Sequence, residues 1–164
     1  MKKYVLTGGP CSGKTTLLSE LKKRGYNIVE ESARDIIRKH NGILPEERQR
    51  RIAKSQLEIE LSLPDNTYFL DRSIIDTIAY SLFHNVTPPC FPDFQLKARY
   101  NKIFLLERLS FKNDGERIEK SEEEAIKVHE KIVEAYQMFG YVLIPVPIMH
   151  VEQRADFILS KIND

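Results

Sequence analysis

A phosphate-binding pattern, G-x-x-x-x-G-K-[ST], is matched at every fixed position by residues 8–15, which read Gly-Gly-Pro-Cys-Ser-Gly-Lys-Thr. Gly8 and Gly13 allow backbone angles that a Cβ atom would forbid. Successive N–H groups and the start of the next helix can then point at phosphate oxygens. An apolar run, Tyr4–Thr7, precedes the pattern, and a leucine-rich amphipathic segment follows it. We therefore predict a strand, a phosphate loop and a helix that bind a nucleoside triphosphate.

The expected ligand is ATP or GTP together with Mg²⁺. Lys14 is predicted to bridge the terminal phosphates, Thr15 to bind Mg²⁺ through its hydroxyl, and Thr16 to contact the α-phosphate. Cys11 is interpreted as a small loop residue, and the alternative is a redox-sensitive thiol. The predicted nucleotide-binding set is Gly8, Gly9, Pro10, Cys11, Ser12, Gly13, Lys14, Thr15 and Thr16.

Two carboxylates follow predicted buried strands. Asp71 comes after Thr67–Leu70, and Glu31 comes shortly after Asn27–Val29. Because parallel strands end at a common edge of the sheet, both acids are expected beside the phosphate loop. Phosphoryl transfer needs neutralised phosphate charge and a group that orients or deprotonates the acceptor. Asp71 is predicted to contribute to the Mg²⁺ site or to orient the acceptor hydroxyl, and Glu31 is the rival candidate for the acceptor base.

Arg72, Asp76 and Tyr80 are spaced four residues apart, so they share one stripe of the predicted helix Arg72–His84. A polar stripe that begins at the carboxyl edge of the sheet could line an acceptor pocket. The alternative is an ordinary surface ion pair between Arg72 and Asp76, worth about 0.2–0.5 kcal/mol.

Gln56 and Glu60 lie within the apolar arc of a long predicted helix, Pro45–Leu63. Buried polar groups need partners. These two side chains are therefore expected either to make structural hydrogen bonds or to face a ligand pocket, and the sequence does not choose between these options.

The segment 107–120 carries several cations around an Asn-Asp-Gly turn and follows the predicted strand Ile103–Leu106. We expect a lid that closes over the phosphates, with Arg117 stabilising the transferring charge. The alternative is a solvated charged loop. His129 is interpreted as a packed or bordering helix residue, and the histidines show no metal-ligand spacing.

Apolar strands and helices follow one another along the whole chain. Within each predicted strand, polar and apolar residues do not alternate. This pattern predicts a three-layer α/β domain with a five-stranded parallel sheet. The further predicted elements are the helices Lys14–Arg24, Ser32–His40 and His150–Ile162, a short helix before Tyr100, a helix capped by Ser121 and ending at Gly140, and a fifth strand, Tyr141–Val146.

The composition is that of an ordinary globular protein, with 164 residues, 41% apolar residues and 30% charged residues. This length predicts a single domain spanning residues 1–164. A net charge of +1 supplies no basic field, so nucleic-acid binding is not expected. Two cysteines are too few for a disulfide framework, and we expect a cytoplasmic protein with no membrane-spanning helix and no secretory signal.

The motifs resemble, in order, those of the NadR-like AAA-type ATPase/kinase family of P-loop proteins. The shared patterns, which span nearly the whole chain, are Glu31-Ser32-Ala33-Arg34, Gln56…Glu60, Asp71-Arg72-x-x-x-Asp76-x-x-x-Tyr80, Asn113-Asp114-Gly115-x-Arg117 and Pro147-x-x-x-Val151-Glu152-x-Arg154. The family includes a ribosylnicotinamide kinase domain and is related to thymidylate and deoxynucleoside kinases. The resemblance implies the sheet order 2-3-1-4-5 and an acceptor site that includes Glu31, Arg34, Gln56, Arg72 and Asp76.

Two other classes of nucleotide-binding protein do not fit. A switch GTPase carries Asn-Lys-x-Asp after a late strand, whereas Asn101-Lys102-Ile103-Phe104 lacks the aspartate and precedes its strand. An AAA+ motor needs a second helical domain and Asp-Glu after its third strand, where this chain has Asp71-Arg72. The remaining hypotheses are a kinase for a small-molecule acceptor and a regulatory ATP- or GTP-binding module or slow NTPase. The acceptor, the base preference and the oligomeric state are not readable from the sequence.

Overall fold

The structure, a computed structural model, describes residues 1–30, 33, 36–37, 42–109 and 121–162, with the backbone alone for residues 93 and 94. One sheet contains five strands, in the order β2-β3-β1-β4-β5, and every neighbouring pair is parallel. The predicted α/β fold and strand order are confirmed. The strands are β1 (Lys2–Thr7), β2 (Asn27–Val29), β3 (Thr67–Asp71), β4 (Lys102–Leu106) and β5 (Leu143–Val146).

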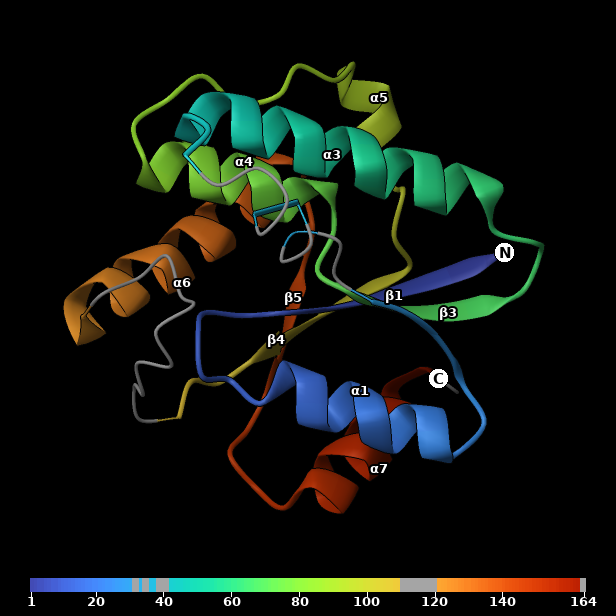
Figure 1. Cartoon of the computed structure of the whole chain (residues 1–164). Coiled ribbons are helices and arrows are strands. Elements are labelled where there is room, and N and C mark those ends of the chain that lie inside the picture. The colour runs from blue at the N-terminus through green and yellow to red at the C-terminus, as the bar shows by residue number, and fades with distance from the viewer. Residues whose placement is uncertain (31–32, 34–35, 38–41, 110–120, 163–164) are drawn as a thin grey trace.

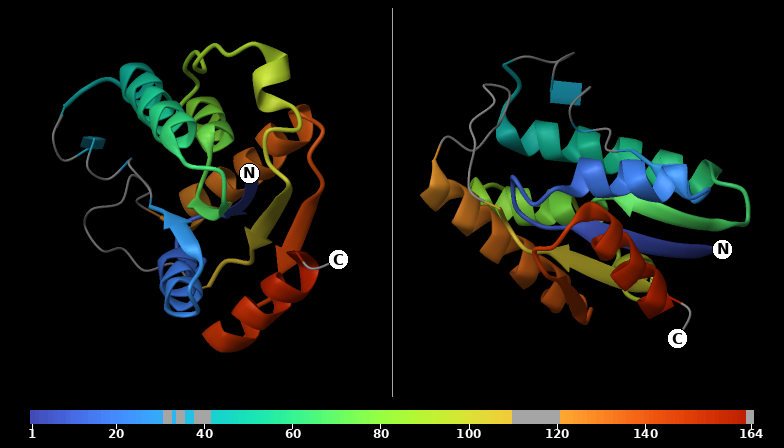
Figure 2. Two further views of the ribbon diagram at one scale, coloured as in Figure 1. Left: turned by 90° about the vertical axis from the view of Figure 1, so that its right-hand side faces the viewer. Right: turned by 90° about the horizontal axis from the view of Figure 1, so that it is seen from below.

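Helices cover both faces of the sheet, which gives the three predicted layers (Figure 1). One face packs against α3, α4 and α6, and the opposite face packs against α1 and α7. Figure 2 shows the same separation from two further directions. The helices are α1 (Lys14–Lys23), α3 (Pro45–Ser62), α4 (Ile74–Phe83), α5 (Asp93–Leu96), α6 (Glu122–Met138) and α7 (Val151–Ile162).

Each central strand contributes side chains to two separate apolar cores. In β1, Val5 packs with the α4 and α6 side, and Leu6 packs with the α1 and α7 side. Both side chains are fully buried, because a strand alternates its side chains between faces and helices cover both faces here. This two-sided burial explains the unbroken apolar runs in the sequence.

Some boundaries differ from the predictions. Helix α4 begins at Ile74 rather than at Arg72, because the Ser73 side chain accepts a hydrogen bond from the Ile75 N–H and so caps the helix. Strand β5 begins at Leu143, two residues later than expected. The predicted helix over residues 32–40 lies largely outside the described residues. None of the described helices is long and apolar enough to cross a membrane.

The strand register determines which side chains meet at the carboxyl edge of the sheet. Leu6 of β1 pairs with Asp71 of β3, and Thr7 pairs with Leu105 of β4. The phosphate loop starts at Gly8, directly after the central strand. Asp71 and the chain leaving β4 are therefore positioned on either side of the loop.

Candidate functional site

The backbone of the phosphate loop adopts the unusual angles that the glycine pattern predicts. The φ angles of Gly8 and Gly13 are 140° and 80°. A Cβ atom at Gly8 would lie 2.7 Å from the Leu106 carbonyl oxygen, so a side chain would collide with β4. Cys11 has a φ of 57°, a strained angle for a residue with a side chain. The loop therefore has a fixed shape that is backed closely by the sheet.

Lys14 lies folded over the loop. Its ammonium group donates hydrogen bonds to the carbonyl oxygens of Gly8 and Gly9, at 2.8 Å and 3.1 Å, and to the Ser12 hydroxyl at 2.9 Å. The side chain is buried, so its charge is shielded from bulk water. These three acceptors are neutral oxygens, and an ammonium group can exchange such contacts for a phosphate anion.

The start of α1 lies at the phosphate loop and carries no negative charge of its own. Gly13 occupies the N-cap without a side-chain hydrogen bond, and the first turn contains no acidic residue. The first N–H groups of a helix carry a partial positive charge and lack intrahelical partners. Thr15 and Thr16 are exposed at this turn. The helix start can therefore bind an anion.

Asp71 and Thr15 line one hollow of about 230 Å³ between α1 and the ends of β2 and β3. Asp71 is only 9% exposed at the end of its strand, whereas Thr15 is open to solvent. Mg²⁺ commonly takes one or two protein oxygens and completes its shell with phosphate and water, so this pair fits the predicted metal. Among the described residues, no group of three or more His, Cys, Asp or Glu residues forms a closed cation site. The other lining residues are Leu18, Ser19, Lys22, Ile28 and Glu30.

Arg72 extends from the carboxyl edge beside Asp71, but it does not belong to α4. Its φ is 67°, and its N–H donates to the Leu6 carbonyl at 3.0 Å. The guanidinium still lies 3.5 Å from an Asp76 oxygen and 5.1 Å from the centre of the Tyr80 ring. The predicted helical stripe is therefore corrected: Arg72 precedes the helix in a left-handed conformation, and its side chain extends along α4 towards Asp76 and Tyr80.

Asp76 is a buried connecting residue, with only 2% of its surface exposed. One carboxylate oxygen accepts from the Thr7 hydroxyl at 2.6 Å. The other accepts from the Ser73 N–H at 2.8 Å and from the Tyr136 hydroxyl at 2.6 Å. The interpretation as a surface ion pair is therefore wrong. Because both oxygens already bind protein groups, Asp76 links the end of β1 to α4 and α6, and its contact with an acceptor stays a prediction.

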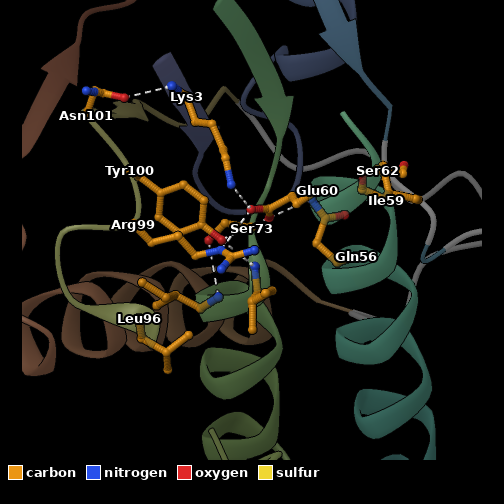
Figure 3. A network of polar contacts seen from close by, with 12 residues as sticks. Lys3, Gln56, Ile59, Glu60, Ser62, Ser73, Leu96, Arg99, Tyr100 and Asn101 are labelled. Carbon is orange, nitrogen blue, oxygen red and sulfur yellow. Dashed lines mark hydrogen bonds and ion pairs between the residues drawn. The ribbon is translucent and has the colours of Figure 1, made fainter. Parts of the chain in front are cut away.

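Hydrogen bonds to Glu60 account for the two buried polar residues, Gln56 and Glu60, within the apolar arc of α3 (Figure 3). Its carboxylate is 1% exposed and accepts from Lys3 at 2.9 Å, from Arg99 at 2.8 Å and from the Tyr100 hydroxyl at 3.0 Å. Gln56 is buried beside it and donates to Glu60 at 3.3 Å. Of the two options left open by the sequence, Glu60 makes structural hydrogen bonds. A contact between Gln56 and the acceptor stays a prediction.

His129 of α6 contacts the phosphate loop, which the sequence did not reveal. Its Nδ1 accepts a hydrogen bond from the Gly9 N–H at 3.2 Å. A Cβ atom on Gly9 would lie 2.9 Å from the Arg108 side chain and 3.1 Å from His129. Burial, Arg108 and Lys14 lower the pKa of His129. No spacing in the sequence connects residue 9 to residue 129, because the contact depends on how α6 packs.

Arg154 of α7 is a second residue that was not assigned to the site. Its NH1 group donates to the Ser12 carbonyl of the phosphate loop at 2.7 Å. A sequence signal was available, because Arg154 lies between Val151 and Ile158 on the apolar face of the helix. A charged residue on the apolar face of a helix predicts a buried charge that is held by specific hydrogen bonds.

Three predicted site residues, Glu31, Arg34 and Arg117, lie outside the described residues, as does most of the predicted lid. Within the described part of that segment, Arg108 bonds to Glu122 of α6 at 2.9 Å. The Leu109 N–H donates to the Cys11 carbonyl at 2.9 Å. The start of the segment is therefore attached directly to the phosphate loop.

A family model described as an AAA domain matches residues 3–154. The chain belongs to this AAA-domain family. The predicted relation to the NadR-like group is confirmed by this match together with the structural likeness to NadR that follows. A search of curated protein sequences found no match.

Solved structures of small-molecule kinases share the fold. NadR in complex with NR is 21% identical, with a TM-score of 0.74, and the match covers 99% of this chain and 50% of that chain. Deoxyadenosine kinase from M. mycoides with bound dATP is 19% identical, with a TM-score of 0.67 and full coverage of both chains. Shikimate kinase from Acinetobacter baumannii is 17% identical, with a TM-score of 0.61, covering 99% of this chain and 93% of that one. The chain thus has a P-loop kinase-like fold.

Proposed function

We propose that the protein is a Mg²⁺-dependent kinase that transfers the γ-phosphate of ATP to a small-molecule acceptor. The observation that carries this proposal is the convergence of Lys14, Thr15 and Asp71 at one sheet edge, with Thr15 and Asp71 lining a common hollow. A cation, a hydroxyl and a carboxylate in this arrangement are the groups that phosphoryl transfer needs. The similar structures act on, or are bound to, acceptors as different as NR and shikimate, which supports a hydroxyl-bearing metabolite.

The loop would bind the triphosphate through its N–H groups and Lys14, with Thr15 and Asp71 at the metal. When bound, Mg²⁺ would neutralise charge on the β- and γ-phosphates. Arg72 and Arg117 would contact the transferring phosphoryl group, and Asp71 or Glu31 would orient and deprotonate the acceptor. The other acceptor contacts would come from Arg34, Gln56 and Asp76.

ATP is the proposed donor, since a second NadR complex contains AMP-PNP and the deoxyadenosine kinase contains dATP. GTP is the alternative donor. We propose a cytoplasmic site of action, because neither cysteine forms a disulfide in the part of the chain that the structure describes.

An acceptor screen tests the activity. Nucleosides, nucleotides, vitamin-like ribosides and hydroxy acids are each incubated with the protein, Mg²⁺ and either ATP or GTP. Release of ADP or GDP is measured together with the mass of the phosphorylated product. We expect one acceptor class to stimulate release severalfold, and the Lys14→Ala variant to lose this stimulation. Slow hydrolysis that no acceptor changes would contradict the kinase and favour a regulatory NTPase.

Two variants separate the candidate bases. Asp71→Asn is expected to lower turnover by about two orders of magnitude while the affinity for ATP changes little, because a charge-neutral isostere removes general-base catalysis and leaves the loop intact. Glu31→Gln is the matched comparison. Whichever variant loses turnover without weaker ATP binding identifies the base. An equal loss of turnover and ATP affinity in Asp71→Asn would refute the catalytic role of Asp71.

A further inference from the structure

Arg154 connects three separate segments beneath the phosphate loop. Its guanidinium donates to the carbonyl oxygens of Ser12 at 2.7 Å, Pro147 at 2.8 Å and Glu107 at 3.4 Å. These carbonyls belong to the loop, to the connection between β5 and α7, and to the chain leaving β4. The residue is only 4% exposed. A single buried side chain thus sets the position of the loop relative to two neighbouring strand ends.

The Ser12 contact also orients a donor in the loop. The C=O of Ser12 and the N–H of Gly13 belong to one planar trans peptide, so they point in opposite directions. Because Arg154 binds the carbonyl, the Gly13 N–H is directed away from α7. Hydrogen bonding at the carbonyl also polarises the peptide and strengthens that N–H as a donor. A Cβ atom on Gly13 would lie 3.2 Å from the guanidinium, so the two groups are closely packed.

The guanidinium of Arg154 is surrounded by neutral hydrogen-bond acceptors. No carboxylate in the described ranges forms an ion pair with Arg154, and all its hydrogen bonds go to neutral carbonyls. Glu107, an exposed residue, provides the electrostatic attraction, while burial lowers the pKa of Arg154. Arg154 also lies in the first turn of α7, where the helix dipole disfavours a cation. A buried charge without an opposite charge is costly.

Arg24 shows the ordinary alternative on the same pair of helices. It bonds to the Glu152 carbonyl at the start of α7, but it also pairs with Glu20 at 2.8 Å and with Asp156 at 2.5 Å. Arg24 therefore has two neutralising partners and lies at the end of α1 that is remote from the loop. Arg154 has no carboxylate partner among the residues that the structure describes, and it lies directly under the loop.

We propose that the opposite charge for Arg154 is the polyphosphate of the bound nucleotide, which makes Arg154 a positioning residue for triphosphate binding. This inference rests on the proposed nucleotide site. It extends that site to a cation that reaches the phosphates through the Ser12–Gly13 peptide. Because the effect is electrostatic, its size should increase with the number of ligand phosphates, and it should depend on the charge of the side chain at position 154.

The test measures the affinities of the full chain for Mg·ATP, Mg·ADP and AMP by calorimetry. Arg154→Gln removes the charge, Arg154→Lys retains it, and Arg24→Gln is the matched control. We expect Arg154→Gln to weaken ATP binding on the order of tenfold or more, ADP binding less and AMP binding little. Arg154→Lys should retain most of the ATP affinity, and Arg24→Gln should match the wild type.

Four results would overturn the inference. If Arg154→Gln weakens binding of all three nucleotides equally, the role is structural. Arg154→Lys keeps the charge and also serves as the test if Arg154→Gln does not fold. If Arg154→Lys loses as much ATP affinity as Lys14→Ala, the charge is not the cause. If the wild type binds neither ATP nor inorganic tripolyphosphate, the inference and the proposed function both fail. If the wild type binds ATP normally and Arg154→Gln binds it equally well, only the inference fails.

Discussion

The hydrogen bond between His129 and the phosphate loop depends on the protonation state of the histidine ring. Its Nδ1 can accept the Gly9 N–H only while that nitrogen carries no proton. The charged groups around the ring are the cations Arg108 and Lys14 and the acids Glu107 and Glu130. Burial and the two cations outweigh the acids, so the pKa of His129 lies below its usual value of 6.5. The folded state therefore favours the neutral ring.

The His129 contact predicts a loss of stability in mild acid. Below about pH 6.5 the unfolded chain takes up a proton at this residue while the folded chain does not, so the free energy of unfolding falls as the pH decreases. His129→Gln should show a smaller decrease between about pH 7.5 and about pH 5.5 in urea denaturation. His150→Gln, at an exposed position, is the control. Parallel pH profiles for His129→Gln and the wild type would refute this prediction.

At the scale of elements, the Glu60 network attaches α3 to the amino end of β1 and to the chain that enters β4. Lys3 and Arg99 both place a cation on one buried carboxylate, and the Tyr100 hydroxyl adds a third donor. Burial and Glu60 raise the pKa of Tyr100 well above its usual value, so it remains a donor. This network lies at the opposite end of β1 from the phosphate loop.

We expect Glu60→Gln to destabilise the fold by about 3 kcal/mol, because two cations then lack their buried partner. The measurement is the urea dependence of unfolding. Glu58→Gln, which alters an exposed residue on the same helix, should change stability by less than about 0.5 kcal/mol. Since the network is remote from the loop, the affinity of folded Glu60→Gln for ATP should equal that of the wild type. A marked loss of ATP affinity would instead place α3 in the binding site.

At the scale of the whole molecule, the phosphate loop is surrounded by residues from the sheet and from the helices on both of its faces. Lys14 starts α1, His129 approaches from α6, Arg154 approaches from α7, and Asp71 ends β3. A ligand bound at this position contacts structure from both sides of the sheet. Binding should therefore stabilise the domain as a unit rather than one local segment.

Mg·ATP is expected to raise the melting temperature of the protein. At a concentration of about 100 times Kd the stabilisation is about 2.7 kcal/mol, which for a chain of this size corresponds to roughly 5–10 °C. Scanning calorimetry with and without Mg·ATP measures the shift. Lys14→Ala should abolish it, and chelation of Mg²⁺ should reduce it. An unchanged melting temperature at high Mg·ATP would argue against a nucleotide site.

The sequence by itself determined the strand–loop–helix at residues 4–24, because the glycines, Lys14 and Thr15 act over a few residues whose local geometry is set by their own types. It also determined the layered α/β class, since apolar strands alternating with helices have few other ways to be buried. The position of Asp71 beside the loop followed from the expectation that parallel strands end at one edge.

Only the tertiary structure decided how distant residues share contacts. Asp76 and Glu60 were readable as polar residues on helices, but their roles depended on Tyr136 and Arg99, which approach from other elements. His129 and Arg154 reach the loop because α6 and α7 pack on opposite faces of the sheet. Sequence periodicity reports which face of a helix is buried and not what lies against it, so these contacts required the packed molecule.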